Sequence, residues 1–331
     1  MNIIVTGGAG FIGSNFLNYF VPKYPTINFL NLDCLTYAGN LNNIKVDKNN
    51  NYKFSKIDIT NKEAIHNVFY DFRPDIIVNF AAESHVDRSI KAPSQFIETN
   101  IVGTFNLIDE FKNLWKGNYE HKRFHHISTD EVYGYLGTQG TFTEKTPYDP
   151  SSPYSASKAS SDHIVRAYHR TFGVPVSITN CSNNFGPLQH DEKMIPTIIR
   201  NAVRNTPIPV YGTGENVRDW LYVKDHCLAI WKVIFEGTSG ESYNIGARND
   251  ISNNVLIHHV LKVLSQMTNK NLSDYTKLIT FVDDRKGHDY RYAINPTKIE
   301  TELNWKSQSS FEDGLKSTVK FYLDKYQKEV S

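Results

Sequence analysis

The sequence is poor in cysteine and has no long apolar stretch. Its three cysteines, Cys34, Cys181 and Cys227, are widely spaced and form neither a metal-binding pair nor an even set. We therefore expect reduced thiols in a cytoplasmic protein, and no metal site. No run approaches the roughly 18 apolar residues that a membrane helix needs, so no membrane association is expected. A strand that starts at Asn2 leaves no room for a signal peptide.

A strong charge of one sign is also missing. The 331 residues carry 36 basic and 35 acidic side chains, a net charge of +1, so the chain has no field that would attract a nucleic acid. Hydrophobic residues make up 40% and charged residues 21%, which is ordinary for a globular protein. At about 150 residues per domain, the length predicts two domains or one large domain with an added lobe.

Short apolar runs alternate with longer amphipathic segments in the first 182 residues. Strands are expected at 2–6, 28–33, 52–57, 75–81, 123–128 and 176–181, and helices at 11–20 (ended by Pro22), 64–72, 94–115 and 153–172. Strands that alternate with helices predict parallel β-α-β units with right-handed crossovers. We therefore predict an α/β fold of the Rossmann type, with a doubly wound parallel sheet.

The rhythm changes after residue 182, where short strands, loops and helices mix. Pro187, Pro196, Pro207 and Pro209 interrupt this part. We predict a first domain at 1–182, rejoined by about 214–236, and a smaller C-terminal α/β lobe formed mainly by 183–331.

A glycine-rich turn follows the first predicted strand. Gly7 lets the chain turn tightly, Gly10 leaves room for a pyrophosphate, and Gly13 lets the next helix approach the sheet. The helix N-terminus then offers free N–H groups to phosphates. Asp33 ends the second strand 20 residues after Gly13, where it can accept from both ribose hydroxyls and would repel a 2′-phosphate. These features predict a bound dinucleotide, NAD rather than NADP.

Two further strand ends fit the same cofactor. Asp58 and Ile59 follow the third strand, where an adenine would lie, although a helix cap is the simpler explanation of Asp58 alone. Ala81 and Ala82 end the fourth strand, and small residues there let a cofactor cross the carboxyl edge of the sheet.

Tyr154 and Lys158 stand four residues apart on one predicted helix and therefore share a face. Ser152 is expected to cap this helix, with Pro153 at its first position. An ammonium one turn away is expected to lower the pKa of the phenol, whose ordinary value is ~10. Such a tyrosine can take a proton from a hydroxyl while a hydride leaves the same carbon.

An acidic pair follows the fifth strand directly. Asp130 and Glu131 would lie at the carboxyl edge of the sheet, and like charges raise one another's pKa. One can stay protonated as an acid while the other acts as a base. Thr129 is placed to hydrogen-bond a sugar hydroxyl. The alternative is a solvated loop in which Asp130 caps a helix.

These motifs together resemble the extended short-chain dehydrogenase/reductase family, and most closely its dTDP-glucose 4,6-dehydratases. The matching stretches are residues 81–90, 128–134, 154–158, 180–184, 218–223 and 284–289. The similar 4-epimerases need the hydroxyl and the Tyr–Lys pair but lack the acidic pair. A nucleotide-sugar 4-epimerase is the first alternative, and a non-catalytic NAD-sensing protein is the second.

The resemblance implies a mechanism in which NAD oxidises C4 of the sugar and later returns the hydride to C6. Tyr154, with Lys158, would deprotonate the 4-hydroxyl, Glu131 would remove the C5 proton, and Asp130 would protonate the departing 6-hydroxyl. The product would be a 4-keto-6-deoxy sugar nucleotide, and NAD would stay bound. Thymine differs from uracil by one methyl group, so dTDP-glucose and UDP-glucose both remain candidate substrates.

The resemblance also assigns contacts and an assembly. The implied NAD contacts are Phe11, Ile12, Asp33, Cys34, Leu35, Thr36, Asp58, Ile59, Phe80, Ala81, Ala82, Glu83, Ser84, Thr99, Tyr154, Lys158 and Asn184. The implied contacts of the nucleotide-sugar, in the C-terminal substrate lobe and beside the cofactor, are Ser84, Thr129, Asn183, Lys193, Met194, Pro209, Val210, Tyr211, Arg218, Asn253, Asp284, Arg285, Lys286, Gly287 and His288. Without the resemblance, Arg218 would be a salt-bridge partner and Asn253 a helix cap. A homodimer is implied, with helices 94–115 and 153–172 forming a four-helix interface, in a deoxysugar pathway such as that of rhamnose.

Overall fold

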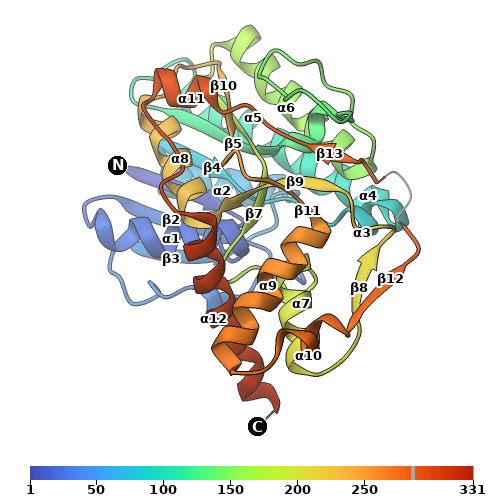
Figure 1. Ribbon diagram of the computed structural model, residues 1–331. Coiled ribbons are helices and arrows are strands. Elements are labelled where there is room, and N and C mark those ends of the chain that lie inside the picture. Colours follow the sequence, from blue (N-terminus) through green and yellow to red (C-terminus); the bar gives the residue numbers. More distant parts are fainter. Residues whose placement is uncertain (285–287, 331) are drawn as a thin grey trace.

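A seven-stranded parallel sheet lies at the centre of the protein (Figure 1). The computed structural model describes residues 1–284 and 288–330. The strands are ordered β10-β6-β5-β4-β1-β2-β3, and every neighbouring pair is parallel. Their bounds are β1 (Asn2–Thr6), β2 (Asn28–Asp33), β3 (Tyr52–Lys56), β4 (Ile76–Asn79), β5 (Arg123–Thr129), β6 (Val176–Cys181) and β10 (Ser242–Ile245). The order reverses between β1 and β4, which confirms the predicted doubly wound sheet and marks where such folds bind ligands.

Helices cover both faces of this sheet. The first layer is α1 (Phe11–Lys23) with α8 (Val223–Glu236), and the second is α2 (Lys62–Phe72), α5 (Thr104–Trp115) and α6 (Pro153–Phe172). Ile3 and Val5 of β1 pack toward the first layer, whereas Ile4 packs toward the second, and all three are fully buried. Because both faces are covered, the central strands β1 and β4 carry the unbroken apolar runs Ile3–Val5 and Ile76–Val78.

A second core lies below the sheet in Figure 1, among α7 (Met194–Val203), α9 (Asn253–Thr268) and α12 (Phe311–Val330). The other elements are β7 (Asn183–Phe185), β8 (Ile208–Tyr211), β9 (Val217–Tyr222), β11 (Asp250–Ser252), β12 (Ile279–Val282), β13 (Arg291–Tyr292), α3 (Val86–Lys91), α4 (Pro93–Phe96), α10 (Leu272–Thr276) and α11 (Thr297–Glu302). The segment expected to rejoin the first domain was about 214–236. β10 (Ser242–Ile245) comes after that segment, and it also joins the main sheet. The division into domains stays a prediction.

The predicted helix 94–115 is confirmed in its extent, but its type changes in the interior. It begins with α4, continues as a π-helix, η2 (Ile97–Gly103), and becomes α5 only at Thr104. A Cβ on Gly103 would lie 2.5 Å from Ile59 Cδ1, so the backbone approaches that side chain as closely as glycine allows. The wider turn lets Asn100 point back to the loop after β4, where its Oδ1 accepts the Glu83 N–H at 2.8 Å. Inserted π-turns often accompany functional sites.

Pro22 does not end the first helix, which continues to Lys23. In the last turn a proline removes only one N–H from the helical ladder, so the helix tolerates it. Cys34, Cys181 and Cys227 are all free, with Cys34 half-buried and the others buried. Among the described residues no helix is long and apolar enough to cross a membrane.

Asn51 holds the turn between α1 and β2 in place. Its Nδ2 group donates to the carbonyls of Val21, Tyr24 and Ile27 at 3.0, 3.1 and 3.0 Å. These carbonyls end a helix and enter a buried strand, so they need partners.

We expect Asn51→Ala to lower the free energy of unfolding by about 1–2 kcal/mol, because it removes the Asn51 donor from the part-buried carbonyls of Val21 and Ile27, whereas the Tyr24 carbonyl still accepts the Ile27 N–H. Asn50→Ala is the control, since Asn50 directly precedes Asn51 in the chain and is exposed. Urea unfolding followed by circular dichroism measures both. Equal midpoints for the two variants would contradict the role given to Asn51.

Candidate active site

A cleft of about 350 Å³ lies at the carboxyl edge of the sheet, where β1, β2, β4, β5 and β6 end. Most of the predicted site residues line it. They are Gly7, Gly10, Phe11, Ile12, Gly13, Asp33, Cys34, Thr36, Asp58, Ile59, Phe80, Ala81, Ala82, Glu83, Ser84, Thr99, Thr129, Asp130, Glu131, Tyr154, Lys158, Asn183, Asn184 and Lys193. The predicted dinucleotide turn, Tyr–Lys pair and acidic pair therefore face one cavity.

The glycine turn brings two strand ends into contact. Gly7 has a φ of 67°, and a Cβ there would lie 2.7 Å from the Ala81 nitrogen. A Cβ on Gly13 would lie 2.5 Å from the Gly7 carbonyl oxygen. Gly10 is the N-cap of α1, so no side chain caps this helix, and its first turn holds no acidic residue. An uncapped helix N-terminus that faces a cavity fits the pyrophosphate of a dinucleotide.

Backbone donors hold Asp33 at the end of β2. Its Oδ2 accepts the Ala9 N–H at 2.9 Å, and its Oδ1 accepts the Leu35 N–H at 2.8 Å. Burial raises the pKa of Asp33, and these two hydrogen bonds lower it. The carboxylate is thus fixed with lone pairs left for ribose hydroxyls, which fits NAD. Leu35 does not line the cleft, although its backbone helps to orient Asp33.

The acidic pair begins a short 3₁₀-helix, η3 (Asp130–Tyr133). Its N-cap is Thr129, whose hydroxyl accepts the Glu131 N–H at 3.3 Å, so the alternative of an Asp130 cap is wrong. Asp130 is 2% exposed, and its Oδ2 has no hydrogen-bond partner in the described part of the chain. Burial raises the pKa of Asp130 well above its ordinary value, and the charge of Glu131 adds to this effect. Both effects favour the protonated form of Asp130.

The Tyr–Lys pair lies in the first turns of α6. Ser152 caps this helix by accepting the Ser155 N–H at 3.0 Å, as predicted. The Lys158 ammonium donates to the Ile127 carbonyl at 2.7 Å, and burial lowers its pKa to about 8. Burial raises the pKa of Tyr154 well above 10, and the charge of Glu131 raises it further. The expected lowering of the Tyr154 pKa by Lys158 is therefore wrong for the protein alone, because desolvation dominates.

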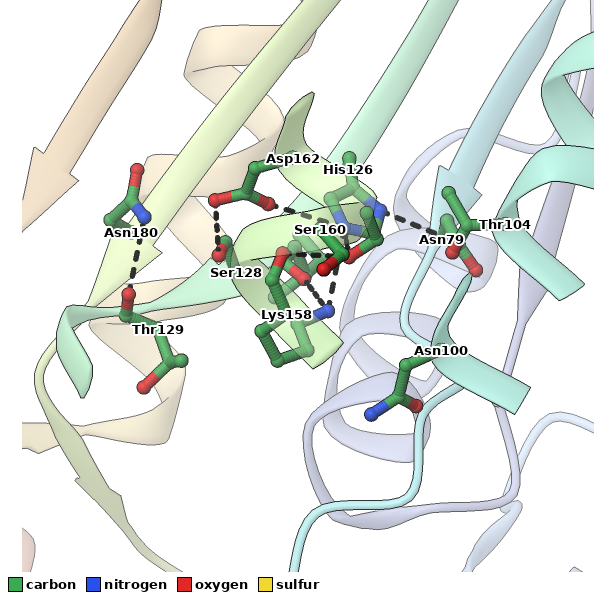
Figure 2. A network of polar contacts seen from close by, with 12 residues as sticks. Asn79, Asn100, Thr104, His126, Ser128, Thr129, Lys158, Ser160, Asp162 and Asn180 are labelled. Carbon is green, nitrogen blue, oxygen red and sulfur yellow. Dashed lines mark hydrogen bonds and ion pairs between the residues drawn. The ribbon is translucent and has the colours of Figure 1, made fainter. Parts of the chain in front are cut away.

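Asn100 ties the elements around the pair together, although sequence reasoning missed it. The side chain comes from the π-helix, and its Nδ2 donates to the Glu83 carbonyl at 3.0 Å and to the Ser157 hydroxyl at 2.8 Å. It thus joins the loop after β4 to α6, close to Lys158 (Figure 2). Thr99, its neighbour in the π-helix, lines the cleft.

Several predicted substrate contacts lie outside the cleft. Met194 packs against the second core, and β8 carries Pro209, Val210 and Tyr211 beside β12. Asp284 follows β12, and its Oδ1 lies 2.6 Å from His288 Nδ1. Asn253 is the first residue of α9, whose cap is Ser252, so the alternative of an Asn253 cap is wrong. Arg285, Lys286 and Gly287 lie outside the described residues.

Arg218 is buried beside the acidic pair rather than in the cleft wall. Its guanidinium donates to the carbonyls of Val217, Asp289 and Tyr290 at 2.7, 2.9 and 3.2 Å. Its charge lowers the pKa of Asp130 and partly offsets the effect of burial. The guanidinium therefore links the chain after His288 to the acid, and its contact with a diphosphate stays a prediction.

Some residues that line the cleft were not predicted. Ser128, Cys181 and Ser182 stand at the ends of β5 and β6, so the same strand-end argument that selected Ala81 would have found them. The segment 189–193 also borders the cleft through Gln189, His190 and Glu192. No local pattern in the sequence marks that loop. The remaining unpredicted lining residues are Leu32, Ala38, Gly39, Ile57 and Ile127.

The chain is similar over its whole length to known sugar-nucleotide enzymes. A family model described as GDP-mannose 4,6 dehydratase matches residues 4–318. A probable dTDP-glucose 4,6-dehydratase of Sinorhizobium fredii is 50% identical over 329 residues, which cover 98% of this chain and 93% of that protein.

Solved structures show the same likeness. The dTDP-glucose 4,6-dehydratase of Bacillus anthracis, in complex with NAD, has a TM-score of 0.88 and 45% identity, with 100% of both chains covered. The dTDP-glucose 4,6-dehydratase of Streptomyces venezuelae, with NAD bound, has a TM-score of 0.89 and 43% identity over 98% of this chain and 97% of that one. The chain therefore belongs to the GDP-mannose 4,6 dehydratase family, together with these dTDP-glucose 4,6-dehydratases.

Proposed function

We propose that the protein is an NAD-dependent hydro-lyase that converts dTDP-glucose to its 4-keto-6-deoxy derivative and water. The observation that carries this proposal is the position of the acidic pair. Asp130 and Glu131 line the same cleft as Tyr154 and Lys158, next to the uncapped end of α1. A 4-epimerase needs no such pair, because it removes no proton from C5 and expels no hydroxyl.

Residues of the cleft fit the cofactor in three ways. The glycine turn leaves no side chain at the pyrophosphate, Asp33 is held for the ribose, and Lys158 points into the region beside Tyr154. Bound NAD would supply a hydride acceptor for C4 and a hydride donor for C6. A cationic nicotinamide beside Tyr154 would also favour the phenolate, which burial alone disfavours.

The side chains of the chain itself would move the protons. Tyr154 takes the proton of the 4-hydroxyl, which Thr129 helps to orient. Glu131 removes the C5 proton once C4 is a ketone, and later returns a proton to C5. Asp130 gives its proton to the departing 6-hydroxyl, for which its raised pKa suits it.

We also propose a homodimer in the cytoplasm, serving a deoxysugar pathway such as that of rhamnose. Apolar side chains are exposed along η2, α5 and α6, where Ile97, Val102, Phe105 and Phe172 are 36–50% exposed. Such a surface supports helix-to-helix contact between two copies. Free thiols at Cys34 and Cys181, beside the cofactor cleft, support a reducing compartment.

Incubation of the purified protein with dTDP-glucose, and separately with UDP-glucose, tests the proposed reaction. Mass spectrometry should show the loss of one water from each consumed molecule, with no net NADH. We expect dTDP-glucose to have the higher kcat/KM by about 10–200-fold, the range for one methyl group in a pocket. An unchanged mass with a galactose configuration would instead make the protein an epimerase.

Substitutions should separate the oxidation from the elimination. Glu131→Gln and Asp130→Asn should lower turnover by about 10²–10⁴-fold, because each removes one proton-transfer group. Both should keep NAD, and with substrate they should accumulate reduced cofactor that absorbs at 340 nm. Tyr154→Phe should give no such absorbance, because the first oxidation is blocked. Loss of NAD from both acidic variants would refute the roles given to them.

The double substitution Ile97→Asp with Val102→Asp should convert the proposed dimer to a monomer, because buried charges without partners oppose association. Light scattering after gel filtration measures the mass. Phe281→Asp is the control, since Phe281 is 59% exposed on β12. A wild-type monomer would contradict the proposed assembly.

A further inference from the structure

A network of buried polar side chains lies beneath the Tyr–Lys pair, between α6 and strands β4 and β5 (Figure 2). Asp162 stands one helical turn after Lys158 and is completely buried. A carboxylate removed from water is costly unless donors and a cation compensate it. The proposed function pairs Lys158 with Tyr154 but assigns no role to Asp162.

Hydrogen bonds to Oδ2 favour the carboxylate form of Asp162. Its Oδ2 accepts the Ser128 hydroxyl at 2.7 Å and the Tyr148 hydroxyl at 2.8 Å. The Tyr148 oxygen in turn accepts from Arg166 at 2.7 Å, so the hydrogen of Tyr148 goes to Asp162. Burial raises the pKa of Asp162, while Lys158, Arg166 and these hydroxyls lower it. An oxygen that accepts two O–H groups favours the ionised form.

His126 lies between Asp162 and the lysine and is neutral. The Thr6 hydroxyl donates to Asn79 Oδ1 at 2.6 Å, so the amide nitrogen of Asn79 faces His126 Nδ1 at 3.1 Å. His126 Nε2 lies 3.4 Å from Asp162 Oδ1, 3.4 Å from Lys158 Nζ and 3.1 Å from Ser161 Oγ, so one ring nitrogen is close to both charged groups. Burial lowers the pKa of His126 well below its ordinary value. The neutral ring lies between the carboxylate and the ammonium without adding a charge.

The charge of Asp162 acts on the Lys158 ammonium from one helical turn away, with His126 Nε2 3.4 Å from Asp162 Oδ1 and 3.4 Å from Lys158 Nζ. Burial lowers the pKa of Lys158 to about 8, and Asp162 followed by Cys181 opposes this change. Burial also raises the pKa of the Cys181 thiol to about 12, so Cys181 is uncharged at neutral pH. Burial also favours the protonated form of Asp130, whose carboxyl faces the cleft. His126 of β5 also lies beside the Lys158 ammonium, but its lowered pKa keeps it neutral, so it adds no charge there.

We propose that Asp162 is a positioning residue for the reaction: it is the buried counter-charge that keeps the shared proton on Lys158, so that Tyr154 rather than Lys158 is deprotonated. The proposal rests on the proposed function, in which Tyr154 and Lys158 act as a pair. Without the negative charge, the buried ammonium releases its proton more easily. Tyr154 would then keep its own proton and could not accept the proton of the sugar's 4-hydroxyl.

The test is the pH profile of kcat for Asp162→Asn in the NAD-bound enzyme. Removal of a negative charge lowers the pKa of Lys158, so the alkaline limb should move to lower pH by about one unit, the low end for a neighbouring opposite charge. At pH 8 the loss of kcat should be about tenfold or more, with KM nearly unchanged. Asp162→Ser removes the same charge with a shorter side chain, so it tests the effect even if the asparagine fits poorly.

Two control variants separate charge from packing. Tyr148→Phe removes one donor to Asp162 but keeps its charge, and should leave the alkaline limb in place. Ser160→Ala removes a hydroxyl of the same helix that donates to the Ala156 carbonyl, and should match the wild type.

A lower kcat at every pH with an unmoved limb in Asp162→Asn and Asp162→Ser would reduce Asp162 to a structural residue and overturn the proposal. So would an equal shift of the limb in Tyr148→Phe. Full activity of Tyr154→Phe would instead overturn the proposed function, so the two failures are distinguishable.

Discussion

The removal of ionisable groups from water at one edge of the sheet governs the rest of the structure. Asp130, Lys158 and Asp162 are at most 4% exposed, although Asp130 and Lys158 line the cleft. Burial opposes the charged form of each group. It therefore favours the protonated form of Asp130 and lets the Lys158 ammonium lose its proton more easily. Burial of these groups thus causes both the chemistry proposed for the cleft and the loss of stability that comes with removing charges from water. Such a site needs a rigid, well-packed support, which the seven-stranded sheet and its two helical layers supply.

The backbone meets this demand where strands end. Gly7 approaches Ala81 too closely for any side chain, which closes the floor of the cleft between β1 and β4. Thr129 caps the short helix that carries the acidic pair, and Ser152 caps the helix that carries Tyr154. The two caps fix the starting points of the catalytic segments, and Asn100 joins the second of them to the loop after β4.

Features that depend on local pattern were predicted well from the sequence. Continuous apolar runs located six strands of the sheet to within a few residues, and glycine spacing and the four-residue step from Tyr154 to Lys158 located the cleft. Features that depend on distant contacts were not. The π-turn needs the approach of Gly103 to Ile59, and β10 has no continuous apolar run that would mark it as a strand of the main sheet. The direction of the Tyr154 pKa was missed because spacing alone does not report burial.

The substrate side of the molecule illustrates the same limit. The guanidinium of Arg218 binds backbone carbonyls of Asp289 and Tyr290, contacts that no pattern around residue 218 indicates. The charge of Arg218 also lowers the pKa of Asp130. One buried cation therefore both binds the chain at residues 289–290 and affects the acidity of Asp130. Arg218, which the resemblance named as a ligand contact, is thus also an internal tie of the fold.

The return of α8 and β10 to the sheet has a consequence for synthesis. When residue 182 has left the ribosome, six of the seven strands are available, but the face that packs on α1 still lacks α8. Val223, Cys227, Ile230 and Ile234, which complete that core, arrive only with residues 223–236. The growing chain therefore exposes an apolar sheet face while the next 50 or so residues are made, a few seconds at about 5–20 residues per second. That interval is when aggregation competes with folding, and chaperone binding is most useful there.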